Sequence, residues 1–177
     1  MTHEARARLR ALSELAAALA AVRTRREVAE VIVEESTRAT GADTCTLYEL
    51  DAARETLTLV AHRGYAPEVL TRIGRITATE GSKALFDAMQ QRAPVWVESE
   101  ADYARLYPEL AAVISPSPRG RAFWCVPLAA EDRLVGVLGV GYCEPRAFPD
   151  DERSFIETLC RHAAESYLRA SRFEHED

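Results

Sequence analysis

The sequence lacks the features that mark membrane proteins, disulfide-rich secreted proteins and metal-binding proteins. No apolar run approaches the ~20 residues that a membrane-spanning helix needs. The nearest, LAAALAAV over residues 15–22, is short and is flanked by Glu14 and Arg23. The four cysteines form no CxxC pair, and none lies near a histidine at zinc-ligand spacing. We therefore expect four reduced, mostly buried thiols, no metal, no membrane insertion and a cytoplasmic location.

Positive charge is also scarce: the chain has 22 basic and 28 acidic residues, which gives a net charge of −6. Lys83 is the only lysine. Proteins that bind nucleic acid or an anionic membrane present a basic patch or stripe, which this balance does not provide. We expect no nucleic-acid partner.

The 177 residues, 47% of them hydrophobic, fit one domain with flanking helices. Thr24 followed by Glu27 forms a capping box, and Gly41 is placed to end the helix that it begins. Periodicity and turn residues predict helices and strands throughout the chain. The predicted helices span 5–22, 24–40, 67–73, 82–91 and 149–172, with one or two short helices in 99–121. The predicted strands span 43–50, 56–62, 94–98, 122–128 and 134–142.

Two strand pairs carry specific expectations. In the strand over 56–62, Leu57, Leu59 and Ala61 are expected on one face. The strands over 122–128 and 134–142 lack charged side chains, which predicts a hairpin covered on both faces. A turn centred between residues 131 and 132 places Cys125 opposite Leu138, which excludes a bridge from Cys125 to the cysteine at 143.

Five phrases in a fixed order carry a family resemblance: TGADTCTLYELD, LTLVAHRGY, EGSKALFDAMQQRAPVWVES, CVPLAAEDRLVGVLGV and FPDDERSFIETLCRHAAESYL. Together they resemble a GAF domain over residues 10–172. The resemblance implies an α+β, GAF-like (profilin-like) fold, with a central antiparallel sheet of five to six strands and helices on both faces. It implies N- and C-terminal helices packed together. The expected parts of this single domain are an N-terminal signalling and dimerisation helix (1–23), a GAF core (24–150) and an exit helix (151–177).

GAF domains are sensory and regulatory modules, so the resemblance implies small-molecule binding relayed through a helical homodimer. RAPVWVES and an exit helix ending LRASRFE look like GAF modules of bacterial sensor histidine kinases, which places the chain in a two-component system. The alternatives are a dimerisation and relay module without ligand, and a GAF module of a cyclase, phosphatase or transcription regulator. A chain ending in the exit helix suggests a fragment of a longer protein.

The resemblance places a pocket under the middle helices, with aromatic and apolar walls and an arginine rim. Its predicted lining residues are Phe86, Met89, Tyr103, Tyr107, Leu110, Ile114, Arg119, Arg121, Phe123 and Trp124. The alternative reading is that these aromatic residues only fill the core. The leucines of the first helix have a heptad-like spacing. The predicted dimer interface is Leu12, Leu15, Leu19, Val22, Leu159, Ala163 and Tyr167.

Catalysis is not expected of this chain. A GAF family that reduces free methionine sulfoxide uses cysteines near the middle helix, but residues 77–97 contain none. No GxSxG nucleophile elbow is present. A covalently attached bilin needs a cysteine, usually followed by a histidine, and no Cys-His pair occurs. The identity of any cofactor stays open.

Overall fold

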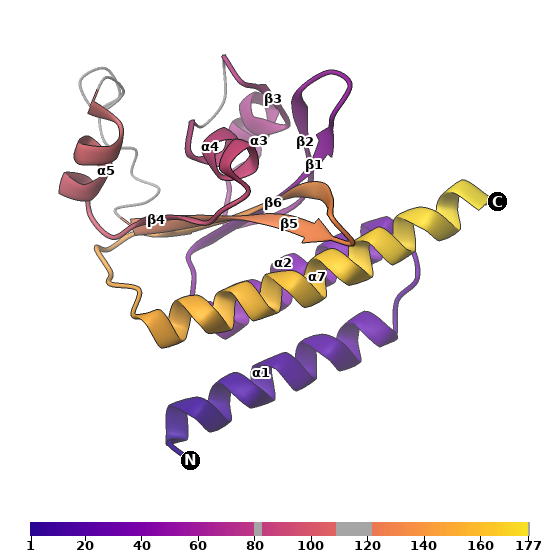
Figure 1. The fold of residues 1–177 in the computed structure, drawn as a ribbon, viewed down its shortest axis with the longest axis horizontal. Helices are drawn as coiled ribbons and strands as arrows, with labels where there is room; N and C mark the ends of the chain where they lie inside the picture. The colour runs from indigo at the N-terminus through magenta and orange to yellow at the C-terminus, as the bar shows by residue number, and fades with distance from the viewer. Residues whose placement is uncertain (80–82, 109–121, 177) are drawn as a thin grey trace.

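A six-stranded antiparallel sheet with helices on both faces forms the centre of the computed structural model, which describes residues 1–79, 83–108 and 122–176 (Figure 1). The strand order is β3-β2-β1-β6-β5-β4. This arrangement confirms the predicted α+β fold. The strands are β1 (Thr44–Asp51), β2 (Thr56–Arg63), β3 (Arg75–Thr77), β4 (Val95–Val97), β5 (Ala122–Ala130) and β6 (Arg133–Tyr142).

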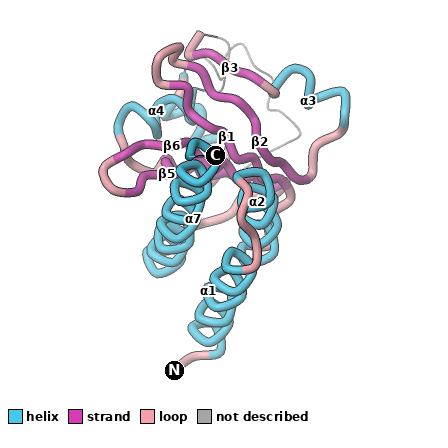
Figure 2. Tube along the Cα trace, turned by 90° about the vertical axis from the view of Figure 1, so that its right-hand side faces the viewer, coloured by secondary structure: helices cyan, strands magenta, loops and turns pink. Residues whose placement is uncertain are grey.

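The helices divide between the two faces of the sheet (Figures 1 and 2). On one face lie α2 (Arg25–Thr40) and α7 (Asp150–Glu176), and α1 (His3–Ala20) packs on both of them as an outer layer. On the other face lie α3 (Pro67–Ile73), α4 (Lys83–Gln91) and α5 (Glu100–Leu106). The predicted packing of the N- and C-terminal helices is therefore confirmed. No helix in the described ranges is both long enough and apolar enough to cross a bilayer.

Local chemistry explains where several helices begin and end. The capping box forms as predicted: the Glu27 amide donates to the Thr24 hydroxyl (3.2 Å), and the Thr24 amide donates to the Glu27 carboxylate (3.0 Å). Gly41 ends α2 with a φ of +65°, a conformation that glycine adopts at low cost. The Ser99 hydroxyl accepts the Asp102 amide and caps α5.

The β5–β6 hairpin is covered on both faces, as its uncharged strands predict. Even-numbered residues of β5 from Ala122 to Leu128 pack toward α7, while Phe123 and Cys125 pack toward α4. A bulge between Leu128 and Ala129 shifts the register. Cys125 consequently pairs with Gly139, so the predicted pairing with Leu138 is wrong by one residue. The cysteines are free, and three of the four are buried.

A second irregularity lies in the β1–β2 pair. Leu47 pairs with Ala61 and Tyr48 with Leu59, so Val60 is the extra residue of a bulge. Ala61 therefore packs toward the α2–α7 side, while Leu59 packs toward the α3–α4 side. The prediction that Leu57, Leu59 and Ala61 share a face is wrong, because the bulge shifts the alternation by one residue.

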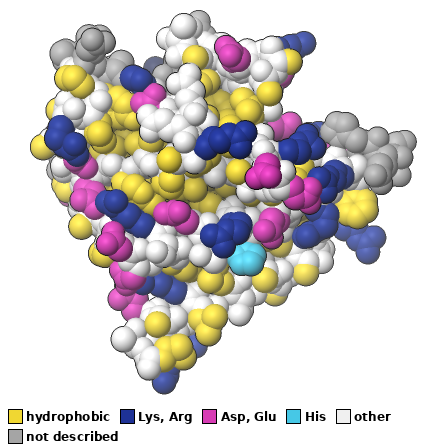
Figure 3. All heavy atoms as spheres, viewed as in Figure 1, with side chains coloured by type: hydrophobic (Ala, Val, Ile, Leu, Met, Phe, Trp, Pro, Cys, Tyr) yellow, Lys and Arg dark blue, Asp and Glu magenta, His cyan; other side chains and the backbone are white. Residues whose placement is uncertain are grey.

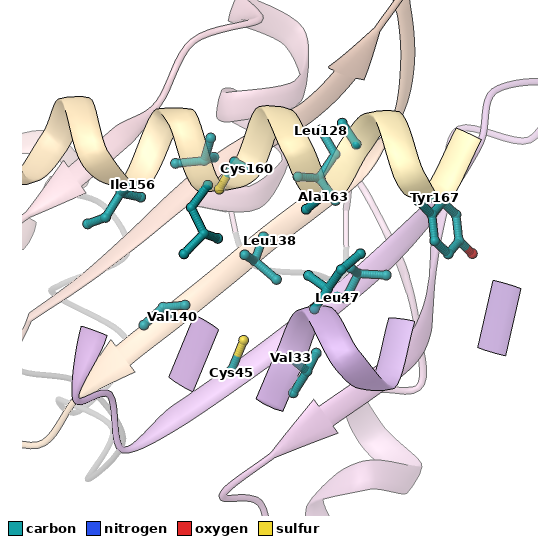
Figure 4. Close-up of a cluster of buried hydrophobic side chains, with 14 of the residues drawn as sticks. Val33, Cys45, Leu47, Leu128, Leu138, Val140, Ile156, Cys160, Ala163 and Tyr167 are labelled. Atoms are coloured by element: carbon teal, nitrogen blue, oxygen red, sulfur yellow. The ribbon is translucent and has the colours of Figure 1, made fainter. Parts of the chain in front are cut away.

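The main core lies between the sheet and the layer of α2 and α7, and Leu15 and Leu19 extend it to α1 (Figure 4). We call it the helix-face core. It includes the predicted interface residues: Leu15, Leu19, Leu159, Ala163 and Tyr167 are each at most 5% exposed, and Leu12 and Val22 pack against them. The heptad-like seam is thus the packing of the protomer's own helices. It buries Leu15, Leu19, Leu159, Ala163 and Tyr167 within one chain and leaves Leu12 and Val22 only partly buried.

Candidate functional site

A second apolar cluster lies on the opposite face of the sheet, under α3, α4 and α5. We call it the pocket-face cluster. Hydrophobic side chains gather in hollows on either side of α4 (Figure 3). The buried members are Tyr48, Leu57, Ile76, Ala84, Leu85, Ala88, Met89, Tyr107, Cys125 and Val137. Partly buried members are Leu50, Leu59, Phe86, Val95, Tyr103, Phe123 and Leu134.

The floor of this cluster carries two groups that can titrate. The Tyr48 hydroxyl donates to the Ile73 carbonyl at 2.8 Å, which ties β1 to the end of α3. Burial raises the pKa of Tyr48, so its phenol stays neutral. Burial also raises the pKa of the Cys125 thiol to about 12. A thiol with that pKa is almost wholly protonated at neutral pH and is a poor nucleophile.

Three aromatic rings form a row between α5 and the sheet. The ring centroids of Tyr103 and Tyr107 are 5.3 Å apart, and those of Tyr103 and Phe123 are 6.0 Å apart. Both spacings fall in the range in which aromatic pairs attract each other. Tyr107 is buried, whereas Tyr103 and Phe123 are partly exposed. The row therefore presents ring surface to the region between α4 and α5.

Polar groups from α4 meet the end of this row. The Lys83 ammonium lies 2.9 Å from an Asp87 carboxylate oxygen and 5.8 Å from the centroid of the Tyr107 ring. Burial, followed by the charge of Asp87 and a hydrogen bond to it, raises the pKa of Tyr107. The phenol therefore stays protonated beside this carboxylate. This arrangement combines ring faces, one carboxylate and one ammonium in a small region.

The structure brings together five of the ten predicted pocket residues. Phe86 and Met89 on α4, Tyr103 and Tyr107 at α5, and Phe123 on β5 belong to the pocket-face cluster. Four others, at positions 110, 114, 119 and 121, lie outside the described residues. They are Leu110, Ile114, Arg119 and Arg121.

Trp124 is not with the others, which corrects its predicted place. Its side chain is fully buried in the helix-face core, 6.3 Å from the Trp96 ring, and its indole N–H donates to the Tyr142 hydroxyl at 3.4 Å. Neighbouring residues of a strand point to opposite faces. Because Phe123 faces α5, Trp124 must face α7.

The sequence-based list missed Tyr48, Lys83, Asp87 and Cys125. Lys83 and Asp87 are an i, i+4 pair of opposite charge, a signal that the helix pattern contained. Tyr48 and Cys125 carry no local signal, because only the register of β1 and β5 within the sheet decides which face they occupy.

A polar cluster at the C-terminal end of α7 lies across the sheet from Tyr48. We call its four residues, Arg25, Glu49, Tyr167 and Glu174, the α7 anchor. The Arg25 guanidinium contacts the Glu49 carboxylate at 3.2 Å and the Glu174 carboxylate at 2.6 Å. The Tyr167 hydroxyl donates to Glu49. Burial, then this hydrogen bond and the charge of Glu49, raises the pKa of Tyr167, so it remains a donor.

A shallow groove of about 500 Å³ separates the C-terminal ends of α1 and α7. Leu19, Val22 and Ala170 contribute to its apolar lining, and Phe173 at its rim is 61% exposed.

Among the described residues, no group of three or more His, Cys, Asp or Glu side chains is placed to hold a metal ion.

Comparison with protein families gives one match, and comparison with solved structures gives the same fold. The profile of the GAF domain family matches residues 22–166. A search of curated proteins gives no match. Among solved structures, the GAF domain of a phosphoenolpyruvate-protein phosphotransferase from Coxiella burnetii is 20% identical, with a TM-score of 0.79 over 98% of this chain and 99% of that one.

Two further structures have the same fold at similarly low identity. Free methionine-R-sulfoxide reductase from Neisseria meningitidis, solved with its substrate, is 17% identical, with a TM-score of 0.76 over 97% of this chain and 95% of that one. The second GAF domain of DevS from Mycobacterium smegmatis is 20% identical, with a TM-score of 0.66 over 86% and 99%. At these identities the likeness extends to the fold alone.

Proposed function

Because the chain belongs to the GAF domain family, we propose that it is a regulatory module that binds a small molecule between α4, α5 and the sheet. The observation that carries this proposal is the row of Tyr107, Tyr103 and Phe123 beside the Lys83–Asp87 pair. Ligand sites are typically apolar and aromatic concavities with a few polar groups that orient the ligand. The pocket-face cluster has that composition.

The route by which binding would reach α7 is the strand β1. Tyr48 lies in the pocket-face cluster, and the next residue, Glu49, holds Arg25 and Tyr167 on the opposite face. A shift that passes from β5 through β6 to β1 would therefore change the α7 anchor. Small helix shifts of this kind are a common way of passing a signal between sites.

The test is a thermal-shift screen with cyclic nucleotides, amino acids, quaternary amines and tetrapyrroles. At least one compound is expected to stabilise the protein, and Phe123→Ala is expected to abolish the effect. Phe173→Ala is the matched control, because its ring lies on the other side of the molecule. A hit that Phe123→Ala leaves unchanged would place the ligand elsewhere, and a screen without hits would contradict the proposal.

For the protein to which this module belongs, we propose a bacterial two-component sensor histidine kinase. The resemblance of the RAPVWVES phrase and of the exit helix supports this assignment. Reading the coding sequence around this segment tests it. A phosphoacceptor helix followed by an ATP-binding domain is the expected result, whereas a cyclase, phosphatase or DNA-binding domain would replace it with one of the alternatives.

A homodimer is a second proposal, favoured by exposed apolar side chains on the helical side. Leu9 on α1 is 57% exposed and Phe173 on α7 is 61% exposed. We propose that a second copy covers these residues in place of the buried leucine seam. Light scattering should give a dimer that Leu9→Arg or Phe173→Arg dissociates. Leu106→Arg on α5 is the control, and a monomeric wild-type chain would contradict the proposal.

The proposed role is regulatory rather than catalytic. Cys125 is the cysteine of the pocket-face cluster among the described residues, and its high pKa keeps the thiol protonated. Free thiols agree with a reducing compartment, so we propose a cytoplasmic location. Treatment with a thiol-specific alkylating reagent tests whether Cys125 is unreactive. The exposed Cys143 should react first, and the buried Cys125 should react only after unfolding.

A further inference from the structure

The single lysine of the chain is held in the way that a bound organic cation would be held. Its ammonium is 2.9 Å from the Asp87 carboxylate and 5.8 Å from the centroid of the Tyr107 ring. Attraction between a cation and a ring face operates within about 6 Å of the centroid. The Lys83 side chain is 56% exposed, so its ammonium is free to move into solvent at little cost.

The groups around this ammonium have the charge distribution that favours a cation. Tyr107, Tyr103 and Phe123 form a row of three rings whose faces carry partial negative charge. The side chain of Asp87 is only 16% exposed, and it lies where the row meets α4. Quaternary ammonium groups are commonly recognised by aromatic side chains in this way.

The same groups disfavour an anion. A carboxylate or phosphate placed on the row would meet the negative faces of the rings and the charge of Asp87. Lys83, at the start of α4, is already paired with that carboxylate.

We propose that the ligand of this site is a small organic ammonium compound, whose cationic group binds Asp87 and the rings of Tyr103 and Tyr107 in the place that the Lys83 ammonium occupies in the free protein. This inference rests on the proposed function, since it names the ligand class of the same site. Lys83 is then an internal competitor. Removing its charge should strengthen binding of the ligand.

Isothermal titration with choline tests the proposal, and the uncharged isostere 3,3-dimethylbutanol provides the comparison. Choline is expected to bind the wild-type protein at least tenfold more tightly than the isostere. Asp87→Asn should weaken choline binding about tenfold, and Tyr103→Leu should weaken it by a similar factor. Lys83→Met should strengthen it threefold or more.

A matched control separates competition from general charge repulsion. Arg105→Met removes an exposed positive charge on α5, whose partner is Asp102. It should leave choline binding within twofold of wild type. Equal strengthening by Arg105→Met and Lys83→Met would overturn the competitor role.

The failure of this inference is distinguishable from the failure of the proposed function. Equal binding of choline and its isostere would overturn the ligand class, while the pocket itself would stand. Absence of choline binding to both the wild type and Lys83→Met would also overturn it. In that case a hit from the thermal-shift screen that depends on Phe123 would still support the proposed function.

Discussion

Tyr48 and Glu49 are neighbours on β1, and their side chains serve opposite faces of the sheet. The Tyr48 hydroxyl donates to the Ile73 carbonyl beneath α3, at 2.8 Å. Glu49 accepts from Tyr167 on α7 and contacts Arg25 on α2 at 3.2 Å. One peptide unit therefore separates the pocket-face cluster from the α7 anchor. Alternation along a strand makes this the shortest covalent connection between the two faces.

Loss of the Tyr167 hydroxyl should loosen the end of α7. Tyr167→Phe removes the hydrogen bond to Glu49, and an intramolecular hydrogen bond contributes about 1 kcal/mol to stability. We expect chemical denaturation to give a loss of about that size, and amide exchange to quicken over residues 168–176. Thr158→Ala removes an exposed hydroxyl elsewhere on α7 and is the control. If exchange quickens equally in both variants, the α7 anchor does not hold this end of the helix.

Two adjacent aromatic residues of β5 should respond in different ways. Trp124→Ala empties a fully buried position of the helix-face core and should cost about 3–5 kcal/mol in the free energy of unfolding. Phe123→Ala removes a partly exposed ring of the pocket face and should cost less while abolishing ligand binding. Urea denaturation and ligand titration check the pair. If Phe123→Ala were the more destabilising variant, the assignment of Trp124 to the helix-face core and of Phe123 to the pocket face would be contradicted.

Gly136 is placed where β6 approaches β1 closely. A Cβ atom added at this position would lie 2.0 Å from the Tyr48 carbonyl oxygen, which is backbone and cannot move independently. Gly136→Ala should therefore destabilise the protein more than Gly41→Ala. At Gly41 the added atom meets open space, and the cost is the roughly 1–2 kcal/mol of a left-handed conformation. Thermal melts that rank the two variants in the reverse order would contradict this packing.

Acid should remove a contribution to stability from α5. A side-chain hydrogen bond from Arg105, followed by the backbone N–H of Glu98, lowers the pKa of Asp102 from its ordinary value of 3.8. A lowered pKa means that the stabilisation is present above 3.8 and is lost as the pH falls below it, through the lowered value. The melting temperatures of the wild type and Asp102→Asn should therefore differ less at pH 2.5 than at pH 6. A difference in melting temperature that grows in acid would contradict this prediction.

The sequence predicts the elements whose determinants are local. The capping box at Thr24, the cap at Gly41 and the helix that starts at Pro67 depend on a few neighbouring residues, and all three are present. The strand β3 was not predicted, because three residues with one buried side chain carry no periodic signal. The bulge at Val60 also leaves no trace in the alternation of TLTLVAH.

The candidate site is harder to predict, because its membership depends on which face of the sheet each side chain occupies. Both faces of β5 are apolar, so the pattern could not decide which of Phe123 and Trp124 lies in the pocket-face cluster. The leucines of α1 presented a similar ambiguity. A heptad-like spacing is the same whether a helix packs on its own chain or on a second copy, and here Leu15 and Leu19 pack within the chain.

Amide hydrogen exchange with and without saturating choline is the most direct test of the account, because it follows the pocket and the end of α7 together. Choline is expected to slow exchange in α4 and α5 and to change exchange over residues 168–176, through Tyr48 and Glu49. In Tyr48→Phe the change in α4 and α5 should remain and the change at the end of α7 should shrink. Unchanged exchange in α4 and α5, or protection confined to the groove between α1 and α7, would contradict the account.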